Sequence, residues 1–142
     1  MNQVRDAMIQ VERTARPSHP VALALRMMRE QNISFLPVIG DNGSLYGIVT
    51  EGDLVRLIHR TLSEENGQPT PFWLRGATRE MLQVLPIREV VSRQVDTIGP
   101  DASLEEAAEI MFSRHRRVLP VVDADGKVLG YLTRRAIIDM LI

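Results

Sequence analysis

Apolar side chains follow two different spacings along this chain, and the two spacings alternate. In the clearest helical stretch five of them occupy positions i, i+3, i+4, i+7 and i+8: Leu104, Ala107, Ala108, Met111 and Phe112. That spacing gathers them on one face of a helix, and Ser103 with Glu106 forms a capping-box pair at its start. Unbroken apolar runs such as residues 118–122 are instead typical of buried strands. The pattern therefore predicts a protein of mixed helix and strand.

The same order of elements is predicted in each half of the chain. The elements of the first half are a short strand at 10–14, a helix at 20–31, strands at 35–39 and 45–49, and an apolar helix at 54–58. In the second half, the helix that follows Ser103 leads to strands at 118–122 and 128–132 and to an apolar helix at 137–142. Gly43 and Gly126 mark the hairpin turns. Each half thus reads strand, helix, strand, turn, strand, helix.

A duplication explains this agreement. Residues 4–58 align with residues 87–141 at a constant offset of 83 and without a gap. The identical pairs fall at turns and strand ends and include Pro37/Pro120, Gly43/Gly126, Gly47/Gly130 and Thr50/Thr133. Because a unit of about 55 residues buries too little surface to be comfortably stable alone, we expect two copies that share one core about a pseudo-twofold axis.

The duplication also predicts the domain boundaries. These are a first repeat at 1–60, a linker at 61–86 with a short helical segment, and a second repeat at 87–142. Within the linker, the polar stretch 63–71 contains Pro and Gly and predicts a loop, whereas 78–85 is predicted to be helical. Between them lies the apolar cluster Phe72–Leu74, in which Trp73 either anchors the linker to the folded body or closes over a bound base.

Composition limits the classes of partner. Hydrophobic residues at 44% and charged residues at 25% are ordinary for a globular protein, and the formal charge of -1 argues against a broad nucleic-acid binder. The N-terminal residues are charged where a signal peptide needs an apolar core, and no apolar run reaches membrane-spanning length. We therefore expect a cytoplasmic protein without a nucleic-acid or membrane partner.

Catalytic and metal-binding groups are not evident. There is no cysteine, which excludes disulfides and thiolate chemistry. The three histidines show no metal-ligand spacing, and none lies near a candidate nucleophile. We expect neither an enzyme nor a requirement for a metal cofactor.

The segment most suggestive of chemistry joins the end of a predicted strand to the start of a predicted helix. It reads Gly47-Ile-Val-Thr-Glu-Gly-Asp53. A helix start offers unpaired N–H groups and the positive end of the helix dipole to an anion, with the Thr50 hydroxyl beside them. Asp53 can accept two hydrogen bonds from vicinal hydroxyls such as those of a ribose. These features favour a nucleotide site, while the alternative is that Thr50 and Asp53 only cap the helix.

A pattern shared by both halves carries a family resemblance. It consists of a helix, Leu-Pro-Val at 36–38 and 119–121, a glycine turn, and Gly-x-x-Thr-x-x-Asp at the close of the unit. The pattern resembles the CBS domain, named for cystathionine β-synthase, whose tandem pairs form a Bateman module. The resemblance implies an α/β (α+β) fold of two β-α-β-β-α units packed about a pseudo-twofold axis. It also implies two clefts that take AMP, ADP, ATP or another adenosyl compound.

Residue by residue, the resemblance implies a first cleft with a ribose acceptor. Thr50 and Asp53 would contact phosphate and ribose. Ser34, two residues before the first Leu-Pro-Val, would add to the phosphate site. Arg116, three residues before the second Leu-Pro-Val, would flank the base, where the family usually has an apolar residue.

The second cleft departs from the family pattern. By the resemblance, Thr133 and Arg117 would lie near phosphate and Ile33 near the base, but Ala136 replaces the aspartate of the motif. Arg134 and the arginine after it could serve a more phosphorylated ligand. Because charged hydrogen bonds are worth about 1.5–3 kcal/mol each, we expect a ribonucleoside ligand in the first cleft.

Two functions of different class follow. The first is a non-catalytic sensor that binds an adenosine nucleotide and passes the binding state to a partner or fused domain. The alternative is a ligand-free dimerisation module, and a nucleic-acid binder built on the cluster Arg114-His-Arg-Arg117 is a weaker third. A homodimer through the terminal helices is expected in both main cases, because these helices carry more apolar residues than one core can cover: Leu54, Ile58, Ile137, Ile138 and Leu141.

Overall fold

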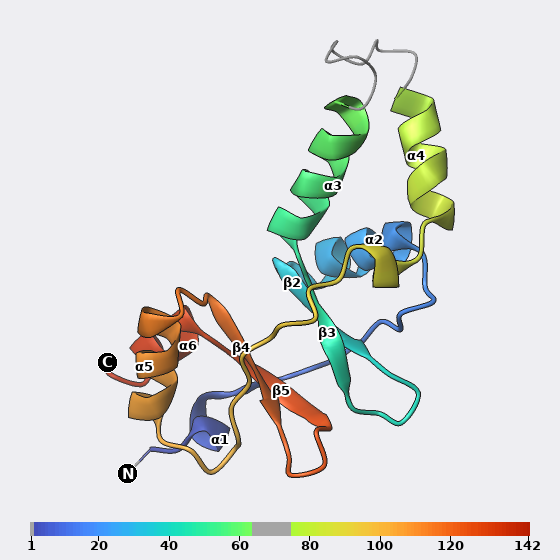
Figure 1. The fold of residues 1–142 in the computed structure, drawn as a ribbon. Coiled ribbons are helices and arrows are strands. Elements are labelled where there is room, and N and C mark those ends of the chain that lie inside the picture. The colour runs from blue at the N-terminus through green and yellow to red at the C-terminus, as the bar shows by residue number, and fades with distance from the viewer. Residues whose placement is uncertain (1, 64–74) are drawn as a thin grey trace. The chain divides into compact units, whose positions relative to one another are not determined.

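The computed structural model describes residues 2–63 and 75–142, which belong to two compact units (Figure 1). The central unit comprises Thr14–Val38 and Tyr46–Arg93, and the terminal unit comprises Met1–Arg13, Ile39–Leu45 and Gln94–Ile142. Each unit has its own buried apolar cluster. Where the sequence predicts one core shared by both repeats, the described residues form two buried clusters, and each cluster contains residues of both repeats.

A two-stranded sheet of β2 (Phe35–Ile39) and β3 (Leu45–Thr50) runs through the central unit. Helix α2 (Val21–Gln31) precedes the sheet, and α3 (Glu51–Ser63), α4 (Arg75–Val84) and a 3-10 turn (Ile87–Glu89) follow it. α2 begins after Pro20, whose missing N–H is harmless at a helix start. It ends at Asn32, which has a left-handed φ of 53°, and it packs against α4.

The core of the central unit explains the unbroken apolar run in β2. Its members are Ala15, Val21, Ala24, Met27, Met28, Leu36, Val38, Val49, Leu54, Leu57 and Ile87. Four consecutive residues of β2 are buried, so both faces of this strand are covered and no alternation is visible in the sequence. Leu54 and Leu57 stand three apart on α3 and turn the same face inward. The expectation that Leu54 lies on a surface for a second chain is therefore wrong, because Leu54 is buried in this core.

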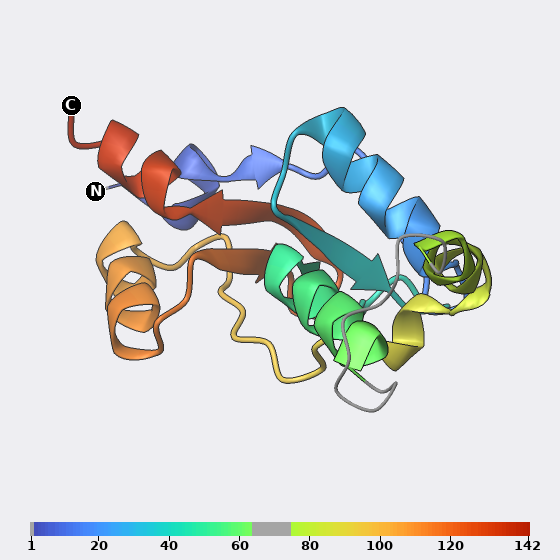
Figure 2. The same ribbon diagram turned by 90° about the horizontal axis from the view of Figure 1, so that it is seen from above.

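The terminal unit contains a three-stranded antiparallel sheet in the order β1–β5–β4. Its strands are β1 (Ile9–Gln10), β4 (Val118–Val122) and β5 (Val128–Thr133), and its helices are α1 (Val4–Ala7), α5 (Leu104–Ser113) and α6 (Arg134–Asp139). α5 and α6 pack against each other at one end of the β4–β5 hairpin (Figure 2). The core consists of Val4, Ile98, Ala107, Met111, Leu119, Val121 and Leu132.

The two repeats exchange the segments that precede their first helices. Ile9 pairs with Tyr131 in β5, and Ser92, its equivalent at the offset of 83, pairs with Ile48 in β3. Each leading segment thus pairs with the closing strand of the other repeat. The compact units consequently do not coincide with the sequence repeats, and each gains buried surface from both.

A glycine in each closing strand permits this close pairing. A Cβ atom at Gly47 would lie 2.4 Å from the carbonyl oxygen of Ser92, and one at Gly130 would lie 2.5 Å from the carbonyl oxygen of Ile9. Both distances are too short for any side chain, and both neighbours are backbone atoms that cannot rotate away. The identity of Gly47 and Gly130 in the duplication therefore has a packing cause.

The tip of the first hairpin belongs to the terminal unit. The amide of Leu45 donates to the carbonyl oxygen of Gly126 at 3.0 Å, and Ser44 forms a bridge with Lys127. Gly43 and Gly126 both have φ of 82°, a conformation that glycine adopts without strain.

Most of the predicted elements are confirmed. The helix at 20–31 and the strands at 35–39 and 118–122 correspond to α2, β2 and β4, and the strands at 45–49 and 128–132 each extend by one residue. The helix at 78–85 is α4, which begins earlier. The Ser103 cap is also confirmed, because its Oγ accepts from the amide of Glu106 at 3.1 Å.

Two boundaries differ from the prediction. The strand expected at 10–14 is β1 at Ile9–Gln10, because these two residues pair with β5 while residues 12–14 are exposed. The last helix ends at Asp139 rather than 142, since the amide of Met140 closes the last turn on Ile137 and Ile138. The predicted loop beyond Ser63 and the cluster Phe72–Leu74 with Trp73 lie outside the described residues.

Candidate functional site

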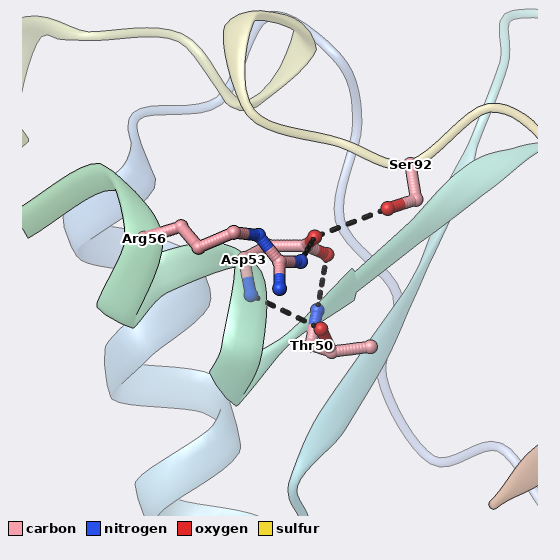
Figure 3. A network of polar contacts seen from close by, with 4 residues as sticks. All are labelled: Thr50, Asp53, Arg56 and Ser92. Carbon is pink, nitrogen blue, oxygen red and sulfur yellow. Dashed lines mark hydrogen bonds and ion pairs between the residues drawn. The ribbon is translucent and has the colours of Figure 1, made fainter. Parts of the chain in front are cut away.

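The candidate site lies where β3 runs directly into α3. The amide of Thr50 donates to Asp53 Oδ2 at 2.9 Å, and the amide of Asp53 donates to Thr50 Oγ1 at 3.2 Å (Figure 3). This reciprocal pair satisfies two backbone donors at the helix start. The helix-cap interpretation of the motif is therefore correct as far as it goes.

Asp53 has further partners on its other carboxylate oxygen. Arg56 Nη2 lies 2.6 Å from Oδ1, and Ser92 Oγ donates to the same oxygen at 3.1 Å. Figure 3 shows Arg56 reaching back along α3 and Ser92 approaching from the neighbouring segment. The residue is only 8% exposed, so these charged and neutral donors compensate a carboxylate that is largely withdrawn from water.

Ser34 is brought to the same place by the backbone. Its carbonyl oxygen accepts a hydrogen bond from the amide of Glu51, the first residue of α3, at 2.9 Å. Ser34 itself is exposed and stands next to the helix start. Ile33, which precedes it, instead packs against the core of the central unit. Three of the predicted residues, Ser34, Thr50 and Asp53, thus meet at the head of α3.

The second closing motif keeps the cap and loses the carboxylate. Thr133 Oγ1 accepts from the amide of Ala136 at 3.1 Å. Ala136 is packed against the core of the terminal unit, so the position of the missing aspartate is apolar here. Arg134 Nε donates to the carbonyl oxygen of Arg116 at 3.3 Å, which brings Thr133, Arg134 and Arg116 together.

Asp96 partly neutralises the arginines of the terminal unit. Arg116 Nε lies 2.7 Å from Asp96 Oδ2, and Arg114 Nη1 lies 3.7 Å from Asp96 Oδ1. Arg117 is exposed. Arg116 is therefore held by a carboxylate rather than presented as an unpaired cation, which the sequence analysis did not foresee.

Each predicted cleft draws residues from both units. Ser34, Ile33, Thr50 and Asp53 belong to the central unit, whereas Arg116, Arg117, Thr133 and Arg134 belong to the terminal unit. The structure brings Ser34, Thr50 and Asp53 together around the first closing motif, and Arg116, Thr133 and Arg134 together around the second. The pairing of Arg116 with the first motif, and of Ile33 with the second, stays a prediction.

Arg56 and Ser92 are the two residues that the sequence analysis missed. Arg56 stands three positions after Asp53 on α3, a spacing at which helical side chains meet, so the sequence did contain a signal for it. Ser92 lies 39 residues away from Asp53 and is brought there by the exchanged segment. No local pattern predicts that contact.

Within residues 2–63 and 75–142, no group of three or more His, Cys, Asp or Glu side chains is placed to hold a metal ion. In the same ranges, no helix combines the length and the apolar character needed to cross a membrane.

Comparison with known proteins assigns the family. The sequence model of the CBS domain matches residues 4–60 and 87–142. An uncharacterized protein of Methanocaldococcus jannaschii is 32% identical over 132 residues, and the match covers 83% of this chain and 79% of that protein. The CBS domain-containing protein CBSX2 of Arabidopsis thaliana is 31% identical over 128 residues, covering 84% of this chain and 54% of that protein.

Solved structures agree with the sequence matches. The crystal structure of CBSX2 in complex with AMP superposes with a TM-score of 0.77 at 29% identity and covers 99% of this chain and 96% of that one. The duplicated β-α-β-β-α pattern, the two matched stretches and this likeness lead to one conclusion: the chain belongs to the CBS domain family and is a CBS pair.

Proposed function

We propose that this CBS pair is a non-catalytic regulatory module that binds an adenosine nucleotide, AMP, ADP or ATP, and passes the binding state to a partner or a fused domain. The observation that carries the proposal is the Asp53 carboxylate, 8% exposed and held at the head of α3 beside Thr50 and Ser34. The AMP complex of CBSX2, which is 29% identical, supports an adenosine nucleotide as the class of ligand.

In this proposal different residues bind the ribose, the phosphate and the base of the nucleotide. Asp53 accepts hydrogen bonds from the ribose hydroxyls, because a carboxylate is an acceptor with several lone pairs. The Thr50 and Ser34 hydroxyls donate to phosphate near the positive end of the α3 dipole. Arg116 lies against the base.

The second site is the weaker of the two in this proposal. Thr133 and Arg117 contact phosphate, Ile33 lies against the base, and Arg134 adds a cation for a more phosphorylated ligand. Ala136 supplies no acceptor for a ribose diol. Because one charged hydrogen bond changes affinity by about tenfold or more, nucleotide binding at the first site dominates.

Calorimetric titration of AMP, ADP and ATP tests the proposal on Asp53→Asn. Asparagine keeps one acceptor oxygen for the amide of Thr50, so the helix cap is disturbed less than by alanine. We expect nucleotide affinity to fall about 10-fold to 100-fold, the effect of losing one charged hydrogen-bond pair. The matched control is Glu51→Gln, which removes an exposed carboxylate from the same turn of α3 and leaves affinity within about twofold.

Unchanged affinity of Asp53→Asn removes this carboxylate from the site. If the wild-type chain binds none of the three nucleotides, the sensor proposal fails as a whole. The dimerisation function is then the remaining candidate.

A homodimer through the closing helices is the second candidate function. Several large apolar side chains of the described residues face solvent: Val55 on α3 at 63% exposed, Ile138 on α6 at 52%, and Leu141 just beyond α6. Beside α6, a groove of about 300 Å³ is lined by Leu104, Ala108, Ile137 and Met140 among others. Exposed apolar side chains beside such a groove of the terminal unit are typical of association sites. Light scattering at micromolar concentration is expected to give twice the chain mass, and a monomer contradicts this candidate.

A further inference from the structure

We propose that Arg56 makes the Asp53 site select phosphorylated adenosyl ligands over neutral ones. Arg56 is the partner that a ribose displaces from Asp53, and it is also the cation that the ligand's phosphate then meets. This inference rests on the proposed function and goes beyond it, since it names the chemical group that the ligand must carry.

Three donors already occupy the Asp53 carboxylate. An ionised carboxylate offers about four lone-pair sites, two on each oxygen. Oδ1 already accepts from Arg56 Nη2 and from Ser92 Oγ, whereas Oδ2 accepts from the amide of Thr50. A vicinal diol that binds across a carboxylate brings one donor to each oxygen. Binding of a ribose therefore requires one of the two partners of Oδ1 to leave.

Arg56 is the partner that can leave. The Ser92 backbone keeps its place beside Asp53, since its amide donates to the carbonyl oxygen of Ile48 at 2.9 Å and its carbonyl oxygen accepts from the amide of Ile48 at 3.0 Å. The Arg56 side chain is 73% exposed, so its guanidinium can return to water at little cost.

The released guanidinium has a second place to bind nearby. A methyl group placed on Gly52 would lie 3.5 Å from Arg56 Nη1 and 3.6 Å from Thr50 Oγ1. The guanidinium and the Thr50 hydroxyl therefore border the same space over the first turn of α3, where the proposed function puts the phosphate. A guanidinium presents parallel N–H donors that match a phosphate in a bidentate way.

Phosphorylated and neutral ligands differ in whether they provide Arg56 with an anionic partner once Asp53 binds the ribose. When a nucleotide binds, its ribose replaces Arg56 at Asp53, and its phosphate binds the released guanidinium. Arg56 therefore still has an anionic partner. When a nucleoside binds, its ribose also replaces Arg56 at Asp53, but it has no phosphate to bind the guanidinium. Arg56 therefore opposes neutral adenosyl ligands and favours phosphorylated ones at the same position.

Calorimetric titration with AMP and with adenosine tests this selectivity, because the two differ only in the phosphate. The wild-type chain is expected to prefer AMP. In Arg56→Gln the ratio of the two affinities is expected to fall about tenfold, the value of one charge-assisted hydrogen bond, through weaker AMP binding and equal or tighter adenosine binding. Arg56→Lys, which keeps the charge but not the planar fork, is expected to give an intermediate ratio.

A matched control removes the same charge elsewhere in the central unit. Arg26→Gln, on the exposed side of α2, is expected to keep the wild-type ratio. An unchanged ratio in Arg56→Gln, with both ligands still bound, overturns the inference and leaves the proposed function standing. If the wild-type chain binds neither AMP nor adenosine, the proposed function fails and the inference falls with it.

Discussion

The two closing motifs of this chain have the same backbone and different chemistry. In both, a threonine hydroxyl accepts a hydrogen bond from the amide three residues later, and a glycine in the preceding strand admits an exchanged segment. The polar network around Asp53 has no equivalent in the terminal unit. At the offset of 83 its three members are all replaced: Asp53 by Ala136, Arg56 by Asp139 and Ser92 by Ile9.

This difference separates what the fold needs from what the site needs. The cap and the glycine remain in both units because they satisfy backbone donors and permit strand pairing. The carboxylate and its two side-chain donors are present together in one unit and lost together in the other, which is consistent with their acting as a group. A carboxylate without its donors would be an uncompensated buried charge.

The largest expected effect concerns a feature that both units share. Gly47→Ala and Gly130→Ala each force a Cβ atom to 2.5 Å or less from a backbone carbonyl oxygen, so each is expected to lower the free energy of unfolding by about 3 kcal/mol. The measurement is urea-induced unfolding followed by circular dichroism. Gly40→Ala is the control, because the nearest atom lies at an ordinary 3.5 Å. Equal stability of Gly47→Ala and Gly40→Ala would contradict the close strand pairing.

The second prediction introduces the missing carboxylate into the terminal unit. In Ala136→Asp one oxygen can accept from the amide of Thr133, but Asp139 and Ile9 stand where the donors would be. We expect a loss of about 1–2 kcal/mol, because a carboxylate at this half-buried position lacks donors for its second oxygen. Adding Asp139→Arg is expected to recover about half of it, and a double-mutant cycle by urea unfolding measures this coupling. A stabilised Ala136→Asp single variant would show that the carboxylate needs no group around it.

The smallest expected effect concerns the long-range member of the network. Ser92→Ala removes one donor from Asp53 Oδ1 while the Arg56 ion pair stays, so the expected loss is about 0.5–1 kcal/mol. Thermal unfolding compares it with Ser18→Ala, which removes an exposed hydroxyl from the same unit. If the two variants melt at the same temperature, the Ser92 hydroxyl does not contribute to holding the carboxylate.

Local patterns were sufficient for most helices and strands. The apolar run of β2 and β4 and the cap at Ser103 are determined by neighbours within a few residues, and these elements lie where the sequence predicts them. The exchange of leading segments could not be predicted in this way. Because the two repeats are alike, Ile9 and Ser92 fit either closing strand by pattern, and tertiary packing decides between them.

The candidate site shows the same division. Thr50 and Asp53 were found because their interaction spans one helical turn, and Arg56 was within reach of the same reasoning. Ser92 was not, since the contact joins residues on different elements. The pairing of Arg116 with Asp96 was missed for the same reason, being a contact over 20 residues.

The exchanged segments have a consequence for the origin of the chain. Ile9 and Ser92 each pair with the closing strand of the other copy, so neither copy uses its own leading segment to complete its strand pairing. Exchange of an identical segment between two copies is a low-cost route to their association. Joining the two copies in one chain keeps this exchange within one molecule, and cutting the chain at residue 86 would give two halves that each supply the segment paired with the other's closing strand.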